Sequence, residues 1–352
     1  MDSATAAETT SQDGWPESQA EGRRRPRHRP SAWLAALLLS GVTAIIGFRL
    51  ADSDGFTPVP QILAFLPWLL APAIAALLLA ALARWRIGLL WGVIALGGVA
   101  WFLEPYGKAD DPRGPAVADV RVMASNVEFG KGTQDLIKAV RKEKPDLLFV
   151  PECDYACSDL LRDELPRSEY PYRSASEASG AEGSVIVSKL RLKKANGVAG
   201  TLGMPGAVAE LKGGHQVRIQ LAHPMPPLPK QLGTWRTELA GLRDYAAEGR
   251  RGDGNKGKGQ VKSTIIAGDF NATQDHAAFR DILDTGGVRD AARLSGSART
   301  PSWPTALFSP LGTQIDHVLA TPDFSARDAH FLDIDNTDHR ALVVDLTLHK
   351  NR

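Results

Sequence analysis

The stretch Ile265-Ile266-Ala267-Gly268-Asp269-Phe270-Asn271-Ala272-Thr273 is the one around which this chain is organised. β-Branched residues dominate the run from Val261 to Ala267, which predicts a buried strand that ends at Gly268. Because side chains alternate along extended backbone, Asp269 and Asn271 are expected on one face. An acid and an amide placed in this way can deprotonate and orient a water molecule, or bind a hard cation through oxygen. Taken alone, the pattern is equally typical of an Asx turn after a strand.

Composition divides the chain into distinct parts. It has 352 residues, enough for two or more structural units, and a formal net charge of +1, which does not indicate a nucleic-acid-binding protein. Residues 1–30 are polar, include an arginine-rich run and lack the apolar content of a core, so we expect a disordered basic tail in the cytoplasm. Residues 31–103 are apolar, residues 104–117 form a charged linker, and residues 118–352 have the composition of a soluble domain.

Three apolar segments, residues 32–48, 60–83 and 87–102, are predicted to be transmembrane helices. No charged residue lies inside them, which favours a tether over a transport pathway. A cleaved signal peptide is the alternative for the first segment, but the long leader and the two further segments disfavour it. Arginines in the tail, with Arg84 and Arg86, predict a multi-pass protein of the plasma membrane with a cytoplasmic N-terminus and an extracytoplasmic domain.

Polar side chains lie at the ends of six predicted strands in residues 118–352. Each of these residues alone is typical of a solvated loop, a cap or a turn. Six such strand ends in one domain are hard to explain as loop chemistry, so we predict that they form one site. The residues are Asn126, Glu152, His223, Asp269 with Asn271, Asp316, and Asp338 with His339.

Cys153 and Cys157 are the only cysteines of the chain. A spacing of four residues suits one turn of helix, and an outer location permits a disulfide. The absence of histidines at finger spacing makes a zinc site improbable. The sequence leaves a local disulfide and two free thiols as open alternatives.

The ordered set of motifs resembles the endonuclease/exonuclease/phosphatase superfamily over about residues 118–348. The three apolar segments ahead of it resemble the membrane-bound branch that includes VanJ-type teicoplanin-resistance proteins. The resemblance implies an α/β fold, a four-layer sandwich of two mixed β-sheets packed face to face with helices outside. The motifs are Ser125-Asn126, Asp146 to Pro151-Glu152, His223, Gly268-Asp269-Phe270-Asn271, Ile315-Asp316-His317 and Thr337-Asp338-His339.

The same resemblance implies a divalent-metal phosphoesterase, usually with Mg²⁺ and with Mn²⁺ as an alternative. It assigns Glu152 as the principal metal ligand, with Asn126 and Asp338 close to the ion. Carboxylate and carboxamide oxygens are the ligands that magnesium prefers. Ser125 stands where threonine is common and Pro151 where glutamine is common, and neither departure removes a ligand.

The resemblance also assigns catalytic roles. Asp269 and Asn271 would position and deprotonate the attacking water. His339, oriented by Asp316, would stabilise charge on the phosphoryl oxygens or assist proton transfer. His223 matches an additional histidine found near the leaving group in deoxyribonuclease-like and sphingomyelinase-like members.

Three further residues have a less specific interpretation. Trp303, in the segment before the Asp316 strand, is either a wall of the substrate cleft or a packing residue. We interpret His276 and His317 as structural or surface residues.

The superfamily hydrolyses DNA, RNA, inositol phosphates, sphingomyelin and coenzymes, so the fold does not select the substrate. An outward-facing site beside the bilayer predicts a lipid-linked phosphate or pyrophosphate of the cell envelope, in keeping with a role in glycopeptide resistance. The first alternative is an extracytoplasmic DNA endonuclease, which the extra histidine favours and the lack of a dense basic and aromatic surface disfavours. The second alternative is a non-catalytic membrane protein that binds a lipid or glycan.

Overall fold

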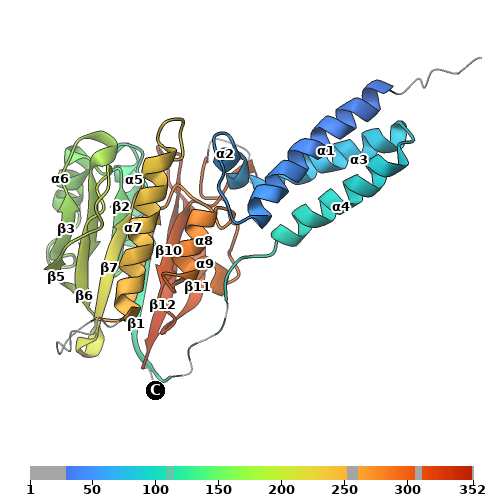
Figure 1. Ribbon diagram of the computed structural model, residues 1–352. Helices are drawn as coiled ribbons and strands as arrows, with labels where there is room; N and C mark the ends of the chain where they lie inside the picture. The colour runs from blue at the N-terminus through green and yellow to red at the C-terminus, as the bar shows by residue number, and fades with distance from the viewer. Residues whose placement is uncertain are drawn as a thin grey trace, which may run out of the picture.

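The computed structural model describes residues 29–108, 110, 112, 114–251, 261–305 and 311–350. Residues 1–28, which make up nearly all of the predicted basic tail, lie outside this range. The remainder forms an α/β domain preceded by a bundle of apolar helices (Figure 1).

Two six-stranded mixed sheets form the centre of the domain. The first has the order β11-β12-β1-β2-β4-β3 and the second the order β5-β6-β7-β8-β10-β9. The pairs β1–β2 and β7–β8 are parallel, and the other pairs are antiparallel. The strands are β1 (Ala116–Ala124), β2 (Leu147–Pro151), β3 (Tyr172–Ser176), β4 (Ser184–Ser188), β5 (Arg191–Ala195), β6 (Gly206–Glu210), β7 (Gln216–Ala222), β8 (Thr264–Asp269), β9 (Arg289–Asp290), β10 (Asp316–Ala320), β11 (Phe324–Asp333) and β12 (Arg340–His349).

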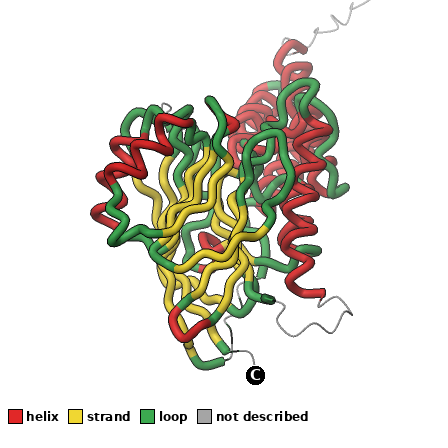
Figure 2. Tube along the Cα trace, turned by 90° about the vertical axis from the view of Figure 1, so that its left-hand side faces the viewer, coloured by secondary structure: helices red, strands yellow, loops and turns green. Residues whose placement is uncertain are grey.

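The two sheets pack on each other through apolar side chains that include Val122, Phe149, Ile219, Ile265 and Val318. Helices α5 (Thr133–Glu143) and α6 (Tyr155–Glu164) cover the outer face of the first sheet, and α7 (Leu232–Arg251) and α8 (Ala277–Asp284) cover that of the second. Figure 2 shows the strands at the centre and the helices outside them. Short helical turns η2 (Gly180–Glu182), η3 (Lys212–Gly214) and α9 (Ala291–Leu294) join the strands. The predicted α/β fold of two mixed sheets flanked by helices is confirmed.

The strand predicted over residues 261–267 is observed as β8, which starts three residues later and ends two residues later, and all of its residues are buried. Gly268 lies inside this strand with a φ of +143°. A Cβ at this position would lie 2.3 Å from the Ala222 carbonyl oxygen of the parallel strand β7, so only glycine fits there. This close approach fixes Asp269 at the carboxyl end of both parallel strands.

The apolar helices ahead of the domain are α1 (Arg29–Leu50), α2 (Val59–Ala64), η1 (Leu66–Leu69), α3 (Leu70–Leu82) and α4 (Arg86–Phe102). Helices α1, α3 and α4 pack together as a bundle (Figure 1). Among the described residues one helix, Pro30–Leu50, is long and apolar enough to cross a membrane, and Leu66–Leu82 and Arg86–Phe102 are shorter apolar helices.

The second predicted segment, residues 60–83, is not one continuous helix. It is interrupted at Phe65, whose φ and ψ are −106° and 29°. Pro67 follows two residues later, and because proline lacks an N–H it cannot donate to the Leu63 carbonyl oxygen and continue the α-helix. The chain therefore makes a separate element, α2, before the apolar helix α3 begins.

The α1–α2 loop and the start of α2 bind the domain next to α8. Asp54 is buried, and its two carboxylate oxygens accept hydrogen bonds from the N–H groups of Ala277 (2.7 Å) and Ala278 (3.0 Å) at the start of α8. His276 Nε2 lies 2.8 Å from the Pro60 carbonyl oxygen. The bundle is thus docked on the domain and not only joined to it through the linker.

Candidate active site

The sheet topology explains why the polar strand ends meet. The carboxyl ends of parallel strands lie at one edge of a sheet, so the residues after β1 and β2, and those after β7 and β8, are neighbours. Strands β10 and β12 run antiparallel to β8 and β1 and therefore begin at the same edges. Because the two sheets pack face to face, both edges contribute to one site. It holds Asn126, Glu152, His223, Asp269, Asn271, Asp316, Asp338 and His339.

Asn126 bridges two carboxylates from different sheets. Its Nδ2 donates to Glu152 Oε1 (3.0 Å) and to Asp269 Oδ2 (3.1 Å), and its Oδ1 accepts from the Glu128 N–H (3.0 Å). Glu152 Oε2 accepts from the Phe129 N–H at 3.1 Å. Asn126 thus holds the two carboxylates at a fixed separation.

His223 lies on the other side of Glu152. Its Nε2 is 3.7 Å from Glu152 Oε1, and its ring is buried, with no hydrogen-bond partner for Nδ1 among the described residues. Burial alone raises the pKa of Glu152, but the adjacent His223 imidazole and the hydrogen bonds from Asn126 and the Phe129 N–H lower it to about 2. Glu152 is therefore ionised at neutral pH. Its φ of +54° is rare for a residue other than glycine, which fits a functional position.

Asp316 and His339 form a buried pair. His339 Nδ1 lies 2.9 Å from Asp316 Oδ2, and its Nε2 points to Asp269 Oδ2 and Asp338 Oδ1, each at 3.8 Å. Burial lowers the pKa of His339, but the Asp316 carboxylate, supported by Asp269 and Asp338, raises it to about 10. His339 is thus an imidazolium at neutral pH, with its Nε2 proton directed into the site.

Asp269 is buried beside this imidazolium. Burial raises the pKa of Asp269 to about 6. The positive charge of His339 lowers this pKa, but the negative charge of Asp316 raises it and partly offsets that effect. The Asn271 N–H donates to Asp269 Oδ1 at 2.8 Å, and Asn271 Nδ2 donates to the Pro224 carbonyl oxygen at 3.0 Å. A carboxylate with this pKa can accept a proton from water near neutral pH.

Trp303 resolves the alternatives left by the sequence. Its Nε1 donates to Asp338 Oδ2 at 2.8 Å, and its ring centroid is 6.5 Å from that of His339. It therefore lines the site and orients one of its carboxylates. The aromatic residue shortly before the Asp316 strand was the signal in the sequence for this role.

The site opens into a pocket of about 640 Å³. One wall holds the carboxylates and histidines described above. The other is largely apolar, and part of it comes from α2 and the start of η1, which the sequence did not connect with the site. The residues of this second wall are Gln61, Ala64, Phe65, Met225, Pro226, Pro227 and Leu228.

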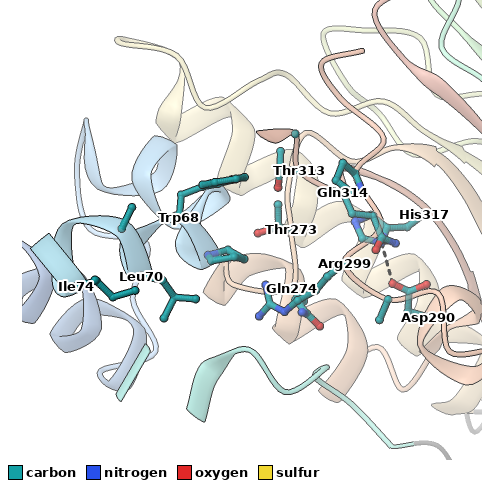
Figure 3. Close-up of a pocket in the computed structure, with 15 residues that line it drawn as sticks. Trp68, Leu70, Ile74, Thr273, Gln274, Asp290, Arg299, Thr313, Gln314 and His317 are labelled. Carbon is teal, nitrogen blue, oxygen red and sulfur yellow. Dashed lines mark hydrogen bonds and ion pairs between the residues drawn. The ribbon is translucent and has the colours of Figure 1, made fainter. Parts of the chain in front are cut away.

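A second pocket of about 460 Å³ lies between η1, α3 and the domain (Figure 3). It contains another buried histidine–aspartate pair, in which His317 Nδ1 lies 2.8 Å from Asp290 Oδ2. His317 Nε2 is 3.1 Å from the Ala272 carbonyl oxygen, so both ring nitrogens bond to the protein. His276 is also buried, with Nδ1 accepting from the Thr273 N–H at 2.9 Å. Both histidines are buried and hydrogen-bonded within the protein, and His276 also lines the pocket of the candidate site.

The two cysteines form a disulfide, with their Cα atoms 5.1 Å apart. Cys153 directly follows Glu152, and Cys157 lies in the first turn of α6. The structure thereby decides between the alternatives that the sequence left open.

The donor set fits a divalent cation. Ligand atoms of the buried residues Asp269, Asp316 and His339 lie within 4.8 Å of one another and could hold a metal ion. Asp316 Oδ1 is buried without a hydrogen-bond partner among the described residues. The ionised Glu152 adds a further oxygen ligand at the same pocket.

Comparisons with known proteins identify the family and the fold. The sequence profile of the Endonuclease/Exonuclease/phosphatase family matches residues 123–339, more than half of the chain. The chain is similar in structure to the human Nocturnin catalytic domain with bound sulfate anion, with 18% identity, a TM-score of 0.52, and coverage of 68% of this chain and 100% of that one. It is also similar to humanized D. rerio TDP2, with 14% identity, a TM-score of 0.51, and coverage of 65% and 99%. No curated protein matches the chain.

Proposed function

Because this chain belongs to the endonuclease/exonuclease/phosphatase family, whose members are metal-dependent hydrolases acting on phosphoester bonds, we propose that it is a membrane-anchored phosphoesterase for lipid-linked substrates. Its active site faces the outer side of the membrane. Its substrate is a phosphate or pyrophosphate of the cell envelope, and the predicted likeness to VanJ-type resistance proteins stays a prediction.

One observation carries the choice of substrate: the composition of the pocket. Among the described residues that line it there is no lysine or arginine, whereas apolar side chains make up much of one wall. A nucleic acid presents a series of phosphates and is bound largely through Lys and Arg. A lipid-linked phosphate presents one anionic group and an apolar remainder, which matches a site with acidic and imidazole groups on one side and apolar groups on the other.

We assign Glu152 as the principal ligand of the cation, with Asp338 and Asn126 beside it. The alternative grouping of Asp269, Asp316 and His339 is less suitable, because Asp316 and His339 bond to each other and the protonated His339 has no lone pair to offer. Asn126 Oδ1 accepts one hydrogen bond, from the Glu128 N–H, and keeps a second lone pair for the ion. Magnesium, or manganese as an alternative, would neutralise charge on the non-bridging phosphoryl oxygens when bound.

The remaining residues would move protons. Asp269 would accept the proton of the attacking water, which Asn271 helps to position. His339, held by Asp316, would direct its Nε2 proton to the phosphoryl oxygens. His223 would lie near the leaving group, where its buried Nε2 is directed at Glu152 Oε1.

Two observations support the location. Helices α1, α3 and α4 expose large apolar side chains outward, among them Trp33 (76%), Leu78 (66%) and Ile87 (71%), which favours a lipid environment over water. This supports the predicted three spans even though α3 and α4 are short for a hydrocarbon core of about 30 Å. The Cys153–Cys157 disulfide supports an oxidising compartment for the domain.

The test is release of phosphate or head group by the purified full-length protein with Mg²⁺. The substrate panel holds lipid pyrophosphates, lipid phosphodiesters and plasmid DNA, with Asp269→Ala and His339→Ala as controls. Turnover of a lipid that both substitutions abolish supports the proposal. Turnover of DNA alone would favour the extracytoplasmic endonuclease, and binding without turnover would favour the non-catalytic alternative.

A further inference from the structure

We propose that α2 and the start of η1 bind the apolar chain of the substrate, with Phe65 as the main contact. The anchor would then be part of the substrate-binding site and not only a tether. This inference rests on the proposed function, since it concerns the lipid of the same reaction. It assigns a specificity-determining role to a segment far from every catalytic motif.

Phe65 is connected to the catalytic groups through a single intervening side chain. Its ring centroid lies 6.4 Å from that of Trp303. The Trp303 ring lies 6.5 Å from that of His339, and its indole N–H binds Asp338. A phosphate held by His339 would therefore place its first substituent within reach of Trp303 and the next part of a chain against Phe65.

The segment that carries Phe65 is fixed to the domain. The Thr313 hydroxyl donates to the Ala64 carbonyl oxygen at 2.6 Å, and Gln61 Nε2 donates to the Pro227 carbonyl oxygen. Thr313 in turn pairs with Trp303 through backbone hydrogen bonds in both directions. The position of Phe65 is thus set by the same loop that orients a site carboxylate, which is the arrangement expected of a binding wall.

Further apolar side chains line the pocket that Phe65 lines. Leu228 and Phe129 line the same pocket and are 49% and 51% exposed, so they lie at its opening. In the other direction, Phe65 leads through η1 into α3, the apolar helix of the bundle. A chain bound along Phe65 would therefore contact apolar side chains from Phe65 to the opening of the pocket.

The two faces of this segment line different pockets. Ala64 and Phe65 face the catalytic pocket, whereas Pro67 and Trp68 face the second pocket (Figure 3). Trp68 thus offers a matched control: it is a large aromatic residue three positions away that does not line the catalytic pocket.

The test uses the full-length protein in lipid nanodiscs with Mg²⁺. The probes are p-nitrophenyl phosphodiesters whose second substituent is an alkyl chain of increasing length, used below their micelle concentrations. All probes share one phosphate and one leaving group, so only chain binding differs. We expect kcat/KM to rise with chain length by up to about fourfold per methylene until the wall is filled. The measured quantity is kcat/KM for the longest-chain probe divided by kcat/KM for the shortest-chain probe. We expect Phe65→Ala to lower this ratio by about tenfold and Trp68→Ala to keep the wild-type ratio.

Phe65→Leu keeps an apolar side chain and should therefore recover most of the wild-type ratio of long-chain to short-chain kcat/KM. Such recovery would show that the lower ratio of Phe65→Ala is not a folding defect. Hydrolysis without any dependence on chain length would overturn the inference and leave the proposed function standing. Equal changes of the ratio in the Phe65→Ala and Trp68→Ala variants would overturn it as well. No hydrolysis of any probe or lipid by the wild-type protein would instead remove the proposed function, and the inference with it.

Discussion

Replacement of Asp316 by asparagine isolates the role of the buried carboxylate behind His339. Asp316→Asn keeps the shape of the side chain but removes the charge that lies 2.9 Å from His339 Nδ1. Asp316 is the largest of the charges that hold the pKa of His339 at about 10 against the effect of burial. Without it, the pKa of His339 should fall close to the ordinary value of about 6.5.

The size of the effect depends on pH. At about pH 8 the protonated fraction of His339 would fall from nearly all to about 3%, which predicts a loss of about 30-fold in kcat from this cause. At about pH 6 roughly three quarters of His339 would stay protonated, so the loss should be less than about twofold. The ratio of variant to wild-type rates should therefore recover as the pH is lowered.

The assay is kcat with saturating Mg²⁺ and a p-nitrophenyl phosphodiester, measured from about pH 5.5 to about pH 9. Asp290→Asn is the matched control. Asp290 belongs to a second buried aspartate–histidine pair, in which its Oδ2 lies 2.8 Å from His317 Nδ1, and this pair lies outside the catalytic pocket. The ratio of the control's kcat to the wild-type kcat should not change with pH. A ratio for Asp316→Asn that is the same at every pH would refute the reasoning, because Asp316 would then not act by keeping His339 protonated.

Three further predictions follow from other contacts of the structure. Wild-type kcat should fall as the pH drops through about 6, since Asp269 then gains the proton that prevents it from accepting another; a rate that is flat down to about pH 5 would contradict this. Glu152→Gln should raise the Mg²⁺ concentration for half-maximal activity by at least about tenfold, and an unchanged requirement in a metal titration would place the ion elsewhere. Asp54→Ala removes the hydrogen bonds that the Asp54 carboxylate accepts from the N–H groups of Ala277 and Ala278. It should lower the free energy of unfolding by about 1–2 kcal/mol and speed amide hydrogen exchange in the first turn of α8. Unchanged exchange there would show that the loop does not cap this helix.

The local features of the domain were predictable from the sequence. Strand β8 differs from the strand predicted over residues 261–267 by only two or three residues at its ends. Alternating or continuous apolar runs report burial directly, because burial of each strand face selects its side chains. Asp269 and Glu152 were recognisable as members of a set, because each alone is typical of a loop or turn but six polar strand ends in one domain are not.

Pairings between distant residues were not predictable in this way. The sequence shows Trp303 before a strand, but only the packed domain places its indole N–H on Asp338. Likewise, the spacing of Cys153 and Cys157 permits both a disulfide and free thiols, and the backbone geometry selects the disulfide.

The sequence by itself indicated the strand-end residues of the site and the apolar character of residues 31–103, because both are encoded in local patterns of burial and polarity, and it indicated the class of the fold through the resemblance of its motifs to a known family. Only the tertiary structure decided that the second apolar segment breaks at Phe65 and that Phe65 lines the catalytic pocket. That contact joins the segment between the apolar helices to residues more than two hundred positions later, such as Trp303, through packing and hydrogen bonds that leave no local pattern in the chain.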